Sequence, residues 1–532
     1  MAAATTLHTP VLIVGAGTVG AVLALELAHH GVASTVLDRG GSDATTPELQ
    51  LEHLGGRSME LLRRLGLAAA IRRAGVGADE ATDVVWSRGL DRPPVLVAPR
   101  PSVSQLVQRY ATVNDGSAPA EHHQHIARGP LGQVLRAAMG ATGFVDLREG
   151  WACAGVRADG DGATATAVEL RDGVQHTIRA RYVVGCDGPR STVRRCAGIG
   201  LEAMPGAHTQ YRAIRFRSKD LALHSRGPGL STLVVGALTL RSHPERHVWV
   251  GHLPVAAGAA LDPARQLRER LGAVVEVLGV HDWDDTLPVA RAYRRGAIFL
   301  AGEAAHAFRP AGDAADTGIG DAVDLGWKLA AVHHGWGGPA LLDSYEAERR
   351  PRALMDRELL ARVLETRRRF ARLAAAGAPR DYLAGFLRQE PALAEDPGMS
   401  YGGRYASSPV VCHERGLPPV PHGPRITPST WPGGRPPAVR LADGGQLFDR
   451  LGPQLTLVDL TDDARGQALA GVARTRGLPV AHLPVFDPAV RACWGRRLVL
   501  VRPDQHVAWR DDTVPEDWDA ILDHVCGRRA RG

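Results

Sequence analysis

Three things are scarce in this 532-residue sequence: cysteines, clusters of basic residues and long uninterrupted apolar runs. The six cysteines are widely spaced and form no C-x-x-C pair, so neither a disulfide framework nor a zinc site is expected, and a reducing cytoplasm fits. The net charge of +6 comes from scattered arginines, and there is no basic stripe of the kind that binds nucleic acid. The composition therefore argues against a disulfide scaffold and against a nucleic-acid partner.

The most apolar long window, residues 11–28, does not read as a membrane span, because it contains three glycines and Glu26. The first ten residues lack the basic segment of a signal peptide, so none is expected. HHQH at 122–125 is interpreted as a polar loop, and no metal site is expected. An apolar share of 44 % over this length is typical of a soluble globular protein with two to four domains.

The first element with a functional signature is GAGTVG at residues 15–20. It follows a short buried strand at 10–14, precedes helical periodicity to about His30, and leads to a second strand that ends at Asp38. Gly15, Gly17 and Gly20 let the backbone turn tightly and approach a pyrophosphate at a helix N-terminus, and the acid can accept bonds from a ribose. These residues predict a β-α-β unit that binds a dinucleotide.

The segment after this unit contains further helices and strands. An amphipathic helix that stops at Gly66 and is followed by another is expected over 54–75, with Arg57 as either a cofactor contact or a surface arginine. Strand-like pieces broken by prolines occupy 84–115, and the alternating pattern of 144–185 predicts a β-meander. The meander ends in CDGPRS, where Asp187 could position ligand hydroxyls.

A second, antiparallel sheet is predicted over 208–253, from strand-like runs separated by polar turns. Residues 260–280 are expected to be helical. A long helical tract over 340–376 is expected to be interrupted near Pro351.

Residues 298–332 read as a strand, a small-residue loop and a helix that begins near Asp321. Apolar residues at 325, 329 and 332 have the spacing of a helix with one buried face. Such a segment brings bare backbone and a helix N-terminus to one point, which suits a ligand with phosphates and a flat polar ring.

The final segment alternates strands and helices again. Residues 379–440 are rich in proline and glycine and predict a linker or an ordered arm. Beyond them, strand-like LTLVDL at 455–460, a helix over 463–476 and later strands predict a small separate α/β domain, which has no redox motif because it lacks C-x-x-C.

Together, GAGTVG with Asp38, CDGPRS, and AGEAAHAFRPAG…TGIGDAVDLGWKLA resemble the single-component FAD-dependent aromatic hydroxylases, the flavoprotein monooxygenases with a para-hydroxybenzoate-hydroxylase fold. VRPDQHVAWR near the C-terminus is similar to the thioredoxin-like domain of the phenol-hydroxylase and polyketide-hydroxylase branch. The resemblance implies an α/β fold with a Rossmann-like FAD-binding domain, an inserted antiparallel-sheet substrate domain and a thioredoxin-like domain. The expected boundaries are 1–190 with 285–376 for FAD (including strand insertions near 84–115), 191–284 for the substrate, 377–440 for the arm and 441–532 for the last domain.

The family's functional residues fall on specific positions of this chain. Gly15, Gly17 and Gly20 would hold the FAD pyrophosphate, and Asp38 the adenosine ribose. Asp187 would lie near the pyrophosphate and the nicotinamide path, and Arg128 would touch the flavin. The aspartate of the family's "GD" motif, which binds the ribityl chain, falls on Glu303 after Gly302. Gly318, the last residue of the loop that follows, would be a further cofactor contact. The positions at the isoalloxazine ring where oxygen reacts would be Pro310, Gly312 and Asp313.

Two departures from the family pattern bear on the chemistry. Glu303 replaces the usual Asp, which keeps the charge and adds a methylene. The loop usually written P-x-G-G-x-G-x-N-T-G is here PAGDAADTG, with Asp313 where a second glycine is usual and Asp316 at the Asn position. A carboxylate there would repel an anionic reduced flavin.

The resemblance implies a monooxygenase that uses FAD, NAD(P)H and O₂ to oxygenate an aromatic or polyketide natural-product intermediate through a flavin C4a-hydroperoxide. The altered loop leaves open a redox-neutral cyclase, for example of the Diels–Alder type, with FAD as a structural cofactor, and a non-catalytic binding protein as a further alternative. The protein would be a cytoplasmic monomer or homodimer without membrane or nucleic-acid partners. The candidate substrate-lining residues are Tyr211, Arg212, Trp249, His252 and Tyr293.

Overall fold

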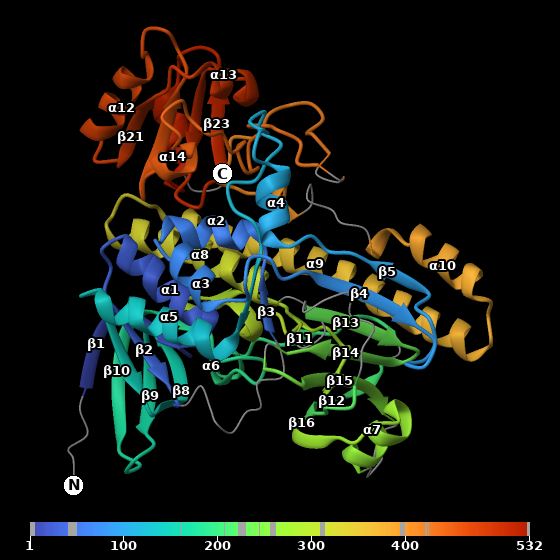
Figure 1. Cartoon of the computed structure of the whole chain (residues 1–532). Coiled ribbons are helices and arrows are strands. Elements are labelled where there is room, and N and C mark those ends of the chain that lie inside the picture. Colours follow the sequence, from blue (N-terminus) through green and yellow to red (C-terminus); the bar gives the residue numbers. More distant parts are fainter. Residues whose placement is uncertain are drawn as a thin grey trace.

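The computed structural model describes residues 6–40, 51–160, 162–206, 208–221, 230–243, 245–255, 262–308, 314–393, 400–420, 423 and 425–528. Two sheets lie side by side in the lower part of Figure 1, and a smaller sheet with its helices stands above them. No helix in these ranges is long and apolar enough to cross a membrane.

The first sheet has the strand order β18-β19-β10-β1-β2-β7, with β9 and β8 extending it from β10. Val14, Leu37, Gly185 and Leu300 are in register, so the carboxyl ends of four parallel strands meet at one edge. The predicted meander is confirmed by the antiparallel pairing of β8, β9 and β10. The strands are β1 (Thr6–Val14), β2 (Ser34–Asp38), β7 (Val145–Glu149), β8 (Trp151–Asp159), β9 (Gly162–Glu169), β10 (Gln175–Gly185), β18 (Arg294–Arg295) and β19 (Ile298–Leu300).

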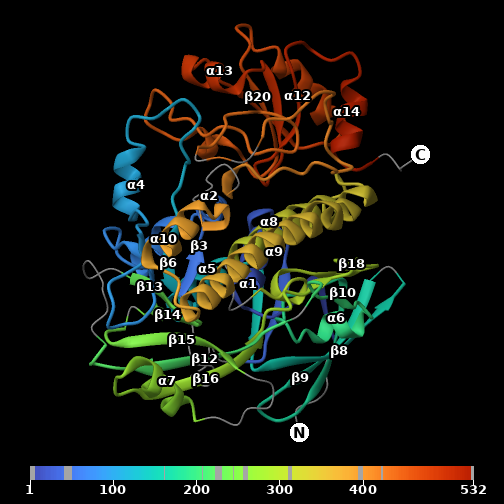
Figure 2. The ribbon, with the colours of Figure 1, turned by 90° about the vertical axis from the view of Figure 1, so that its right-hand side faces the viewer.

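Helices cover this sheet because their apolar residues join its core. α1 packs against both α5 and α8, and its central turns are fully buried. α9 packs on α8 and continues as a long rod toward the second sheet (Figure 2). The main helices are α1 (Thr18–His29), α2 (Gly56–Arg64), α3 (Ala68–Ala74), α5 (Arg128–Ala141), α6 (Thr192–Cys196), α8 (Ala314–His333) and α9 (Pro339–Ala375).

The second sheet has the order β16-β12-β15-β14-β13-β4-β5 and is antiparallel except for the β13–β4 pair. One face packs on α7 (Pro263–Leu271) through an apolar cluster, and the other faces the first unit. The strands that follow the first helix pair, β4 (Thr82–Ser87) and β5 (Leu96–Ala98), therefore complete this sheet. Its other strands are β12 (Gln210–Arg217), β13 (Leu230–Val235), β14 (Leu238–Ser242), β15 (Val248–Val255) and β16 (Glu276–Asp284).

The C-terminal unit has a four-stranded mixed sheet in the order β21-β20-β22-β23, as a small α/β unit should. Its elements are β20 (Leu455–Asp459), α12 (Gly466–Thr475), β21 (Val480–Pro484), α13 (Pro488–Trp494), β22 (Leu498–Val501), β23 (Val507–Asp511) and α14 (Trp518–Val525). The remaining elements are the strand pairs β3 (Leu51–Leu54) with β6 (Gln124–Ala127) and β11 (Leu201–Glu202) with β17 (Val289–Ala290), the helices α4 (Val103–Arg109) and α10 (Arg380–Gln389), and the short 3-10 helices η1 (Gly302–Ala304), η2 (Pro391–Leu393) and η3 (Leu447–Arg450).

Three local predictions are wrong. The helix expected over 260–280 ends at Leu271, because Gly272 adopts a left-handed conformation (φ 60°) and β16 begins at Glu276. α9 runs through Pro351 without a break. Its neighbours Glu348 and Arg349 are held in buried ion pairs, and these contacts outweigh the backbone bond that a proline removes.

The third concerns the helix expected to begin near Asp321. α8 is already helical at Ala314, so Asp321 lies inside it. Its carboxylate is buried and accepts bonds from His306 and Arg349, so the acid is a partner of buried groups and not a helix start.

Candidate functional site

The turn after β1 can be built only with glycine. Gly15 has φ 104°, and a Cβ there would lie 2.4 Å from the Cys186 carbonyl oxygen at the end of β10. A Cβ on Gly20 would lie 1.9 Å from the Gly15 carbonyl oxygen. The turn therefore brings the start of α1 against two strand ends with no room for a side chain.

Gly17 leaves the N-terminus of α1 open. It is the N-cap of this helix and provides no side-chain capping bond, and a Cβ built on it would meet nothing within 4 Å. The first N–H groups of the helix are thus accessible to an anion, and the open side of the turn has the space that a pyrophosphate needs. This geometry fits FAD.

Asp38 ends the neighbouring strand, β2. Its Oδ2 accepts a bond from Arg136 Nη2 at 3.2 Å, and its Oδ1 accepts from the Gly40 N–H at 3.4 Å. A carboxylate has about four lone-pair positions, so two remain for ribose hydroxyls.

Asp187 has a structural role in the chain itself. Its Oδ2 accepts bonds from the N–H groups of Thr192 and Val193 at 2.6 and 3.2 Å, and its Oδ1 from the Ser191 hydroxyl. These bonds fix the start of α6 beside the Gly15 turn, which places the loop after β10 at the same sheet edge.

The start of the 298–332 segment packs on α1. Gly302 has φ 61°, and Cβ atoms on Gly302 and Gly318 would lie 2.7 and 2.5 Å from Val19 Cγ2. Glu303, half-buried in η1, therefore lies near the first turn of α1, where a group extending from the pyrophosphate would pass. Pro310, Gly312 and Asp313 lie outside the described residues.

Buried Asp321 holds the start of the 298–332 segment in place. It accepts bonds from Gly302 N–H at 3.1 Å, His306 Nε2 at 2.8 Å and Arg349 Nε at 2.8 Å. Burial works to raise its pKa, but the contacts with His306 and Arg349 outweigh burial and hold the pKa below its usual value. An ionised carboxylate thus joins η1, α8 and α9.

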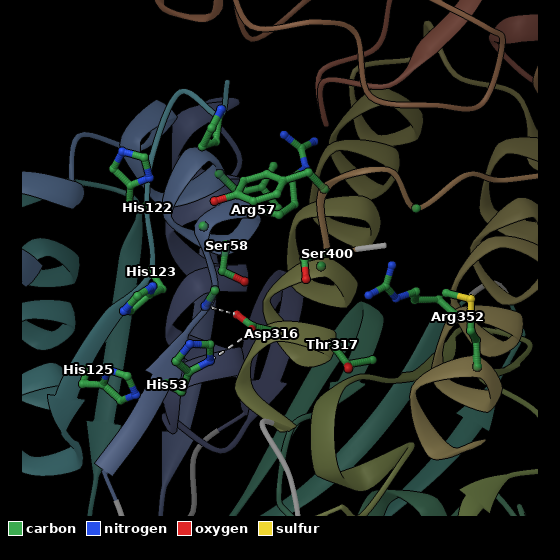
Figure 3. A pocket seen from close by; sticks show the side chains of 18 of the residues that line it. His53, Arg57, Ser58, His122, His123, His125, Asp316, Thr317, Arg352 and Ser400 are labelled. Atoms are coloured by element: carbon green, nitrogen blue, oxygen red, sulfur yellow. Dashed lines mark hydrogen bonds and ion pairs between the residues drawn. The ribbon is translucent and has the colours of Figure 1, made fainter. Parts of the chain in front are cut away.

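A cavity of about 760 Å³ lies beside the start of α8 (Figure 3). One wall comes from β3 and β6, the opposite wall from α8 and α9, and the floor from β13, β14 and β15 of the second sheet. The 400–407 segment and a turn of the C-terminal unit at 502–506 close the remaining side. The cavity is large enough for a multi-ring molecule.

Histidines form one wall of this cavity. The rings of His53 and His125 have centroids 4.8 Å apart, and those of His53 and His123 are 5.5 Å apart. Burial and neighbouring cations lower the pKa of His122 to about 4 and that of His123 to about 3, so both are neutral at pH 7. The interpretation of HHQH as a polar loop holds for His122 and His123 and is wrong for Gln124 and His125, which belong to β6, paired with β3, a strand far away in sequence.

Asp316, in the first turn of α8, faces this wall (Figure 3). Its Oδ1 accepts a bond from Gly55 N–H at 2.8 Å, and its Oδ2 lies 3.9 Å from His53 Nδ1. The residue that stands at the Asn position of the family loop therefore joins α8 to the end of β3.

Arg57 lines the cavity and is held by the C-terminal unit. It donates to the Gln505 side-chain oxygen at 2.9 Å, to the Asp504 carbonyl at 2.8 Å and to Glu60 at 3.0 Å. Gln505 is buried and has φ 58°, a left-handed conformation that is unfavourable for a residue other than glycine. The turn keeps this conformation, and it presents both acceptors to Arg57. Arg57 is thus not a surface arginine, and its role as a cofactor contact stays a prediction.

Five buried charges support this turn. Arg502 binds Glu348, Asp324 and Asp504, and Lys328 binds Asp324 and Glu348. The three carboxylates are the only group in the described ranges with the spacing of a metal site, and the guanidinium and ammonium groups already occupy their oxygens. The group is therefore a structural contact between α8, α9 and the C-terminal unit.

The candidate substrate residues do not line this cavity. Arg212 forms a bidentate ion pair with the exposed Asp282, and Trp249 packs toward α7 with the cluster on the far face of the sheet. Tyr293 is fully buried among core residues. The structure therefore places these three residues away from the cavity, because a period-two pattern does not say which face of a strand a ligand occupies.

Tyr211 and His252 line a second, smaller cavity of about 190 Å³ between the second sheet and α9. Arg128, expected at the flavin, begins α5 with half of its side chain exposed and its Nε 3.8 Å from Glu52, outside the lining of the main cavity. The sequence analysis did not predict that the histidines and the C-terminal turn at 502–506 line the cavity. For the histidines, the one available signal was their dense spacing at 122–125.

Comparison with known proteins agrees with this geometry. Residues 8–250 and 256–356 match the FAD binding domain, and residues 429–529 match the aromatic-ring hydroxylase C-terminal domain. An FAD-dependent monooxygenase, apdD, of Emericella nidulans is 31 % identical over 97 % of this chain and 90 % of its own length. A tetracenomycin A2 monooxygenase-dioxygenase of Streptomyces glaucescens is 31 % identical over 96 % of this chain and 94 % of its own.

Among solved structures, the rebeccamycin biosynthetic enzyme RebC with reduced flavin is similar, with a TM-score of 0.85 and 30 % identity over 98 % of this chain and 100 % of that chain. The similarity spans all three units described above, including the C-terminal one.

Proposed function

The chain belongs to the family of FAD-dependent aromatic-ring hydroxylases, and from its site we propose that it oxygenates an aromatic or polyketide small molecule with FAD, NAD(P)H and O₂. The observation that carries this is the glycine turn at the start of α1 combined with a cavity of about 760 Å³ beside the start of α8. A nucleotide site alone would suit many proteins. A nucleotide site next to a cavity large enough for a multi-ring molecule suits chemistry on an organic substrate.

Bound FAD supplies hydride acceptance from NAD(P)H and oxygen activation. In this proposal the N–H groups at the start of α1, with Gly15, Gly17 and Gly20, hold the pyrophosphate. Asp38 accepts bonds from the ribose, Glu303 with Gly302 lies along the ribityl chain, and Gly318 is a further cofactor contact. Asp187 keeps the neighbouring loop in place, and Arg57, fixed by the C-terminal turn, remains the candidate contact from the cavity side.

The cavity walls orient the substrate and exclude water. Neutral His123 can both donate and accept a hydrogen bond, so it suits hydroxyl and carbonyl groups on an aromatic ring. The turn at 502–506 and the 400–407 segment cover the cavity, and exclusion of water protects reactive oxygen chemistry from hydrolysis. Pro310, Gly312 and Asp313 remain the proposed loop at the ring.

The proposal includes the division into an FAD-binding domain, an inserted substrate domain and a C-terminal domain that we regard as thioredoxin-like. It also includes a cytoplasmic location and a monomeric or homodimeric state. The relatives from Emericella nidulans and Streptomyces glaucescens carry the name monooxygenase, which favours oxygenation over a redox-neutral cyclase.

Anaerobic stopped-flow absorbance tests the function. The FAD-loaded protein is mixed with NADH or NADPH, with and without aromatic polyketide compounds, and then with O₂. We expect the flavin absorbance to bleach, faster with substrate present, and to return with a product heavier by one oxygen atom. Product formation without any flavin reduction would contradict the monooxygenase proposal and support a redox-neutral cyclase.

A further inference from the structure

The second cavity contains buried polar groups that have no hydrogen-bond partner within the described ranges. His252 is 7 % exposed, and neither of its ring nitrogens has a hydrogen-bond partner among the described residues. The indole N–H of Trp283, 9 % exposed, also has none there. A buried polar group without a partner costs roughly 1–3 kcal/mol, so a site that retains two such side chains calls for an explanation.

Aromatic surfaces shape this cavity. The rings of Tyr211 and Trp283 stack at a centroid distance of 4.4 Å and an angle of 13°. His252 meets Trp283 edge-on at 5.8 Å and pairs with Ala213 and Thr239 in the sheet, which fixes the imidazole between two neighbouring strands. These rigid groups leave a slot of about 190 Å³, which suits one aromatic ring with polar substituents.

The charge around the slot is positive. Four arginines line it, namely Arg241, Arg367, Arg368 and Arg372, and no acidic side chain appears among the described residues that line it. Asp285 and Glu365 pair with Arg368 and Arg372 at the margin. Burial, Arg241 and Arg367 lower the pKa of His252 to about 3, so the imidazole is neutral and offers one donor and one acceptor.

The slot adjoins the main cavity, because Arg241 lines both. A molecule with its reacting ring in the main cavity could therefore place a second group at His252.

We propose that the slot between the second sheet and α9 is a binding subsite for a planar acidic group, a carboxylate or ionised hydroxyl on an aromatic ring, with His252 as its central polar contact. The N–H of the neutral imidazole donates to the acidic oxygen. Tyr211 and Trp283 bound the ring, and the arginines favour the negative charge. The binding of an acidic aromatic group in this slot does not depend on the proposed function. The idea that this group is one end of the hydroxylase substrate does rest on it.

Calorimetric titration of the FAD-loaded protein with salicylate and with salicylamide, its uncharged analogue, tests the subsite without any turnover. We expect salicylate to bind at least about ten-fold more tightly than salicylamide, and His252→Phe to weaken salicylate binding about ten-fold, which is the loss of about one hydrogen bond. His252→Phe removes unpartnered nitrogens, so its thermal midpoint should equal or exceed that of the parent.

Two matched variants make the result specific. Trp249→Phe changes the same strand on the opposite face and should leave salicylate affinity unchanged. His123→Phe changes the main cavity and should weaken salicylate binding less than His252→Phe does. Equal binding of salicylate and salicylamide would overturn the proposal. So would salicylate binding that is insensitive to His252→Phe or that is lost in His123→Phe. Flavin reduction by NAD(P)H is measured separately. Absence of salicylate binding at the subsite would therefore leave the oxygenase proposal intact, and absence of flavin reduction would leave the subsite proposal intact.

Discussion

Replacing Arg502 by Met should destabilise the protein strongly, although the residue lies in the C-terminal unit and far from the glycine turn. Its guanidinium is fully buried and lies 2.7 and 2.8 Å from the two oxygens of Glu348, 2.9 Å from Asp324 and 2.7 Å from Asp504. The substitution leaves three buried carboxylates with Lys328 as their remaining cation. Breaking a buried pair on one side costs about 3–5 kcal/mol, because the remaining charge stays uncompensated.

The cost should depend on pH in a defined direction. Burial opposes ionisation, yet Arg502 and Lys328 hold the pKa of Glu348 well below its usual value, so its pairing stabilises the fold above about pH 4.5 and is lost on acidification. Asp324 differs, because burial, Glu348 and Asp504 already raise its pKa well above the usual value in the parent. In the variant Glu348 and Asp504 lose the same cation, so their pKa values rise as well and ionisation of the group at high pH becomes more costly. The destabilisation should therefore be larger at pH 8 than at pH 5.

Urea unfolding followed by tryptophan fluorescence, with calorimetry to detect separate transitions of the units, measures the effect. Arg476→Met is the matched control, since Arg476 pairs with Asp519 and Asp523 at the surface of the same unit and should cost less than about 1 kcal/mol. Arg502→Met combined with Glu348→Gln should recover part of the loss. An Arg502→Met cost no larger than that of Arg476→Met, or one that does not change with pH, would refute the reasoning.

Three further outcomes are expected. Gly20→Ala should abolish FAD retention, because its Cβ would lie 1.9 Å from the Gly15 carbonyl oxygen. The flavin absorbance of the purified protein measures this, and full retention would contradict the proposal that the glycine turn binds the pyrophosphate. Tyr293→Phe should leave the thermal midpoint equal or raise it, since the buried hydroxyl has no partner in the described part of the chain; a clear fall would reveal a missed bond. Asp313→Gly should speed flavin reduction by NAD(P)H in stopped-flow, because it removes a negative charge from the proposed ring loop; an unchanged rate would discard the repulsion argument.

The cofactor half of the site was predictable because its signals are local. Gly15, Gly17, Gly20 and Asp38 lie within one β-α-β unit, and the spacing of such residues follows from the geometry of a strand, a turn and a helix. The parallel register of four strand ends then brings the 185–191 and 298–332 segments to the same edge. Only the resemblance to known hydroxylases links these segments at the level of the sequence.

The cavity half was not predictable in the same way. His53 and His125 meet only because β3 pairs with β6, and Arg57 meets Gln505 across almost the whole sequence. Nothing in the pattern of either segment encodes these pairings. The charges of α8 mislead in another way. Asp324 and Lys328, four residues apart, look like a solvated helix pair and are instead fully buried.

α8 explains why a family of aromatic-ring hydroxylases would keep a C-terminal unit that has no redox motif. Its N-terminal half packs through Gly318 on the first turn of α1, where the pyrophosphate is proposed to bind, while Asp324, nearly two turns further on, binds both Arg502 and Lys328. The same turn presents Gln505 to Arg57. α8 thus fixes the position of the C-terminal unit relative to α1, because α1 packs on one part of this helix and the C-terminal unit on another. The C-terminal unit is therefore a wall of the cavity, and its buried charges fix the position of that wall.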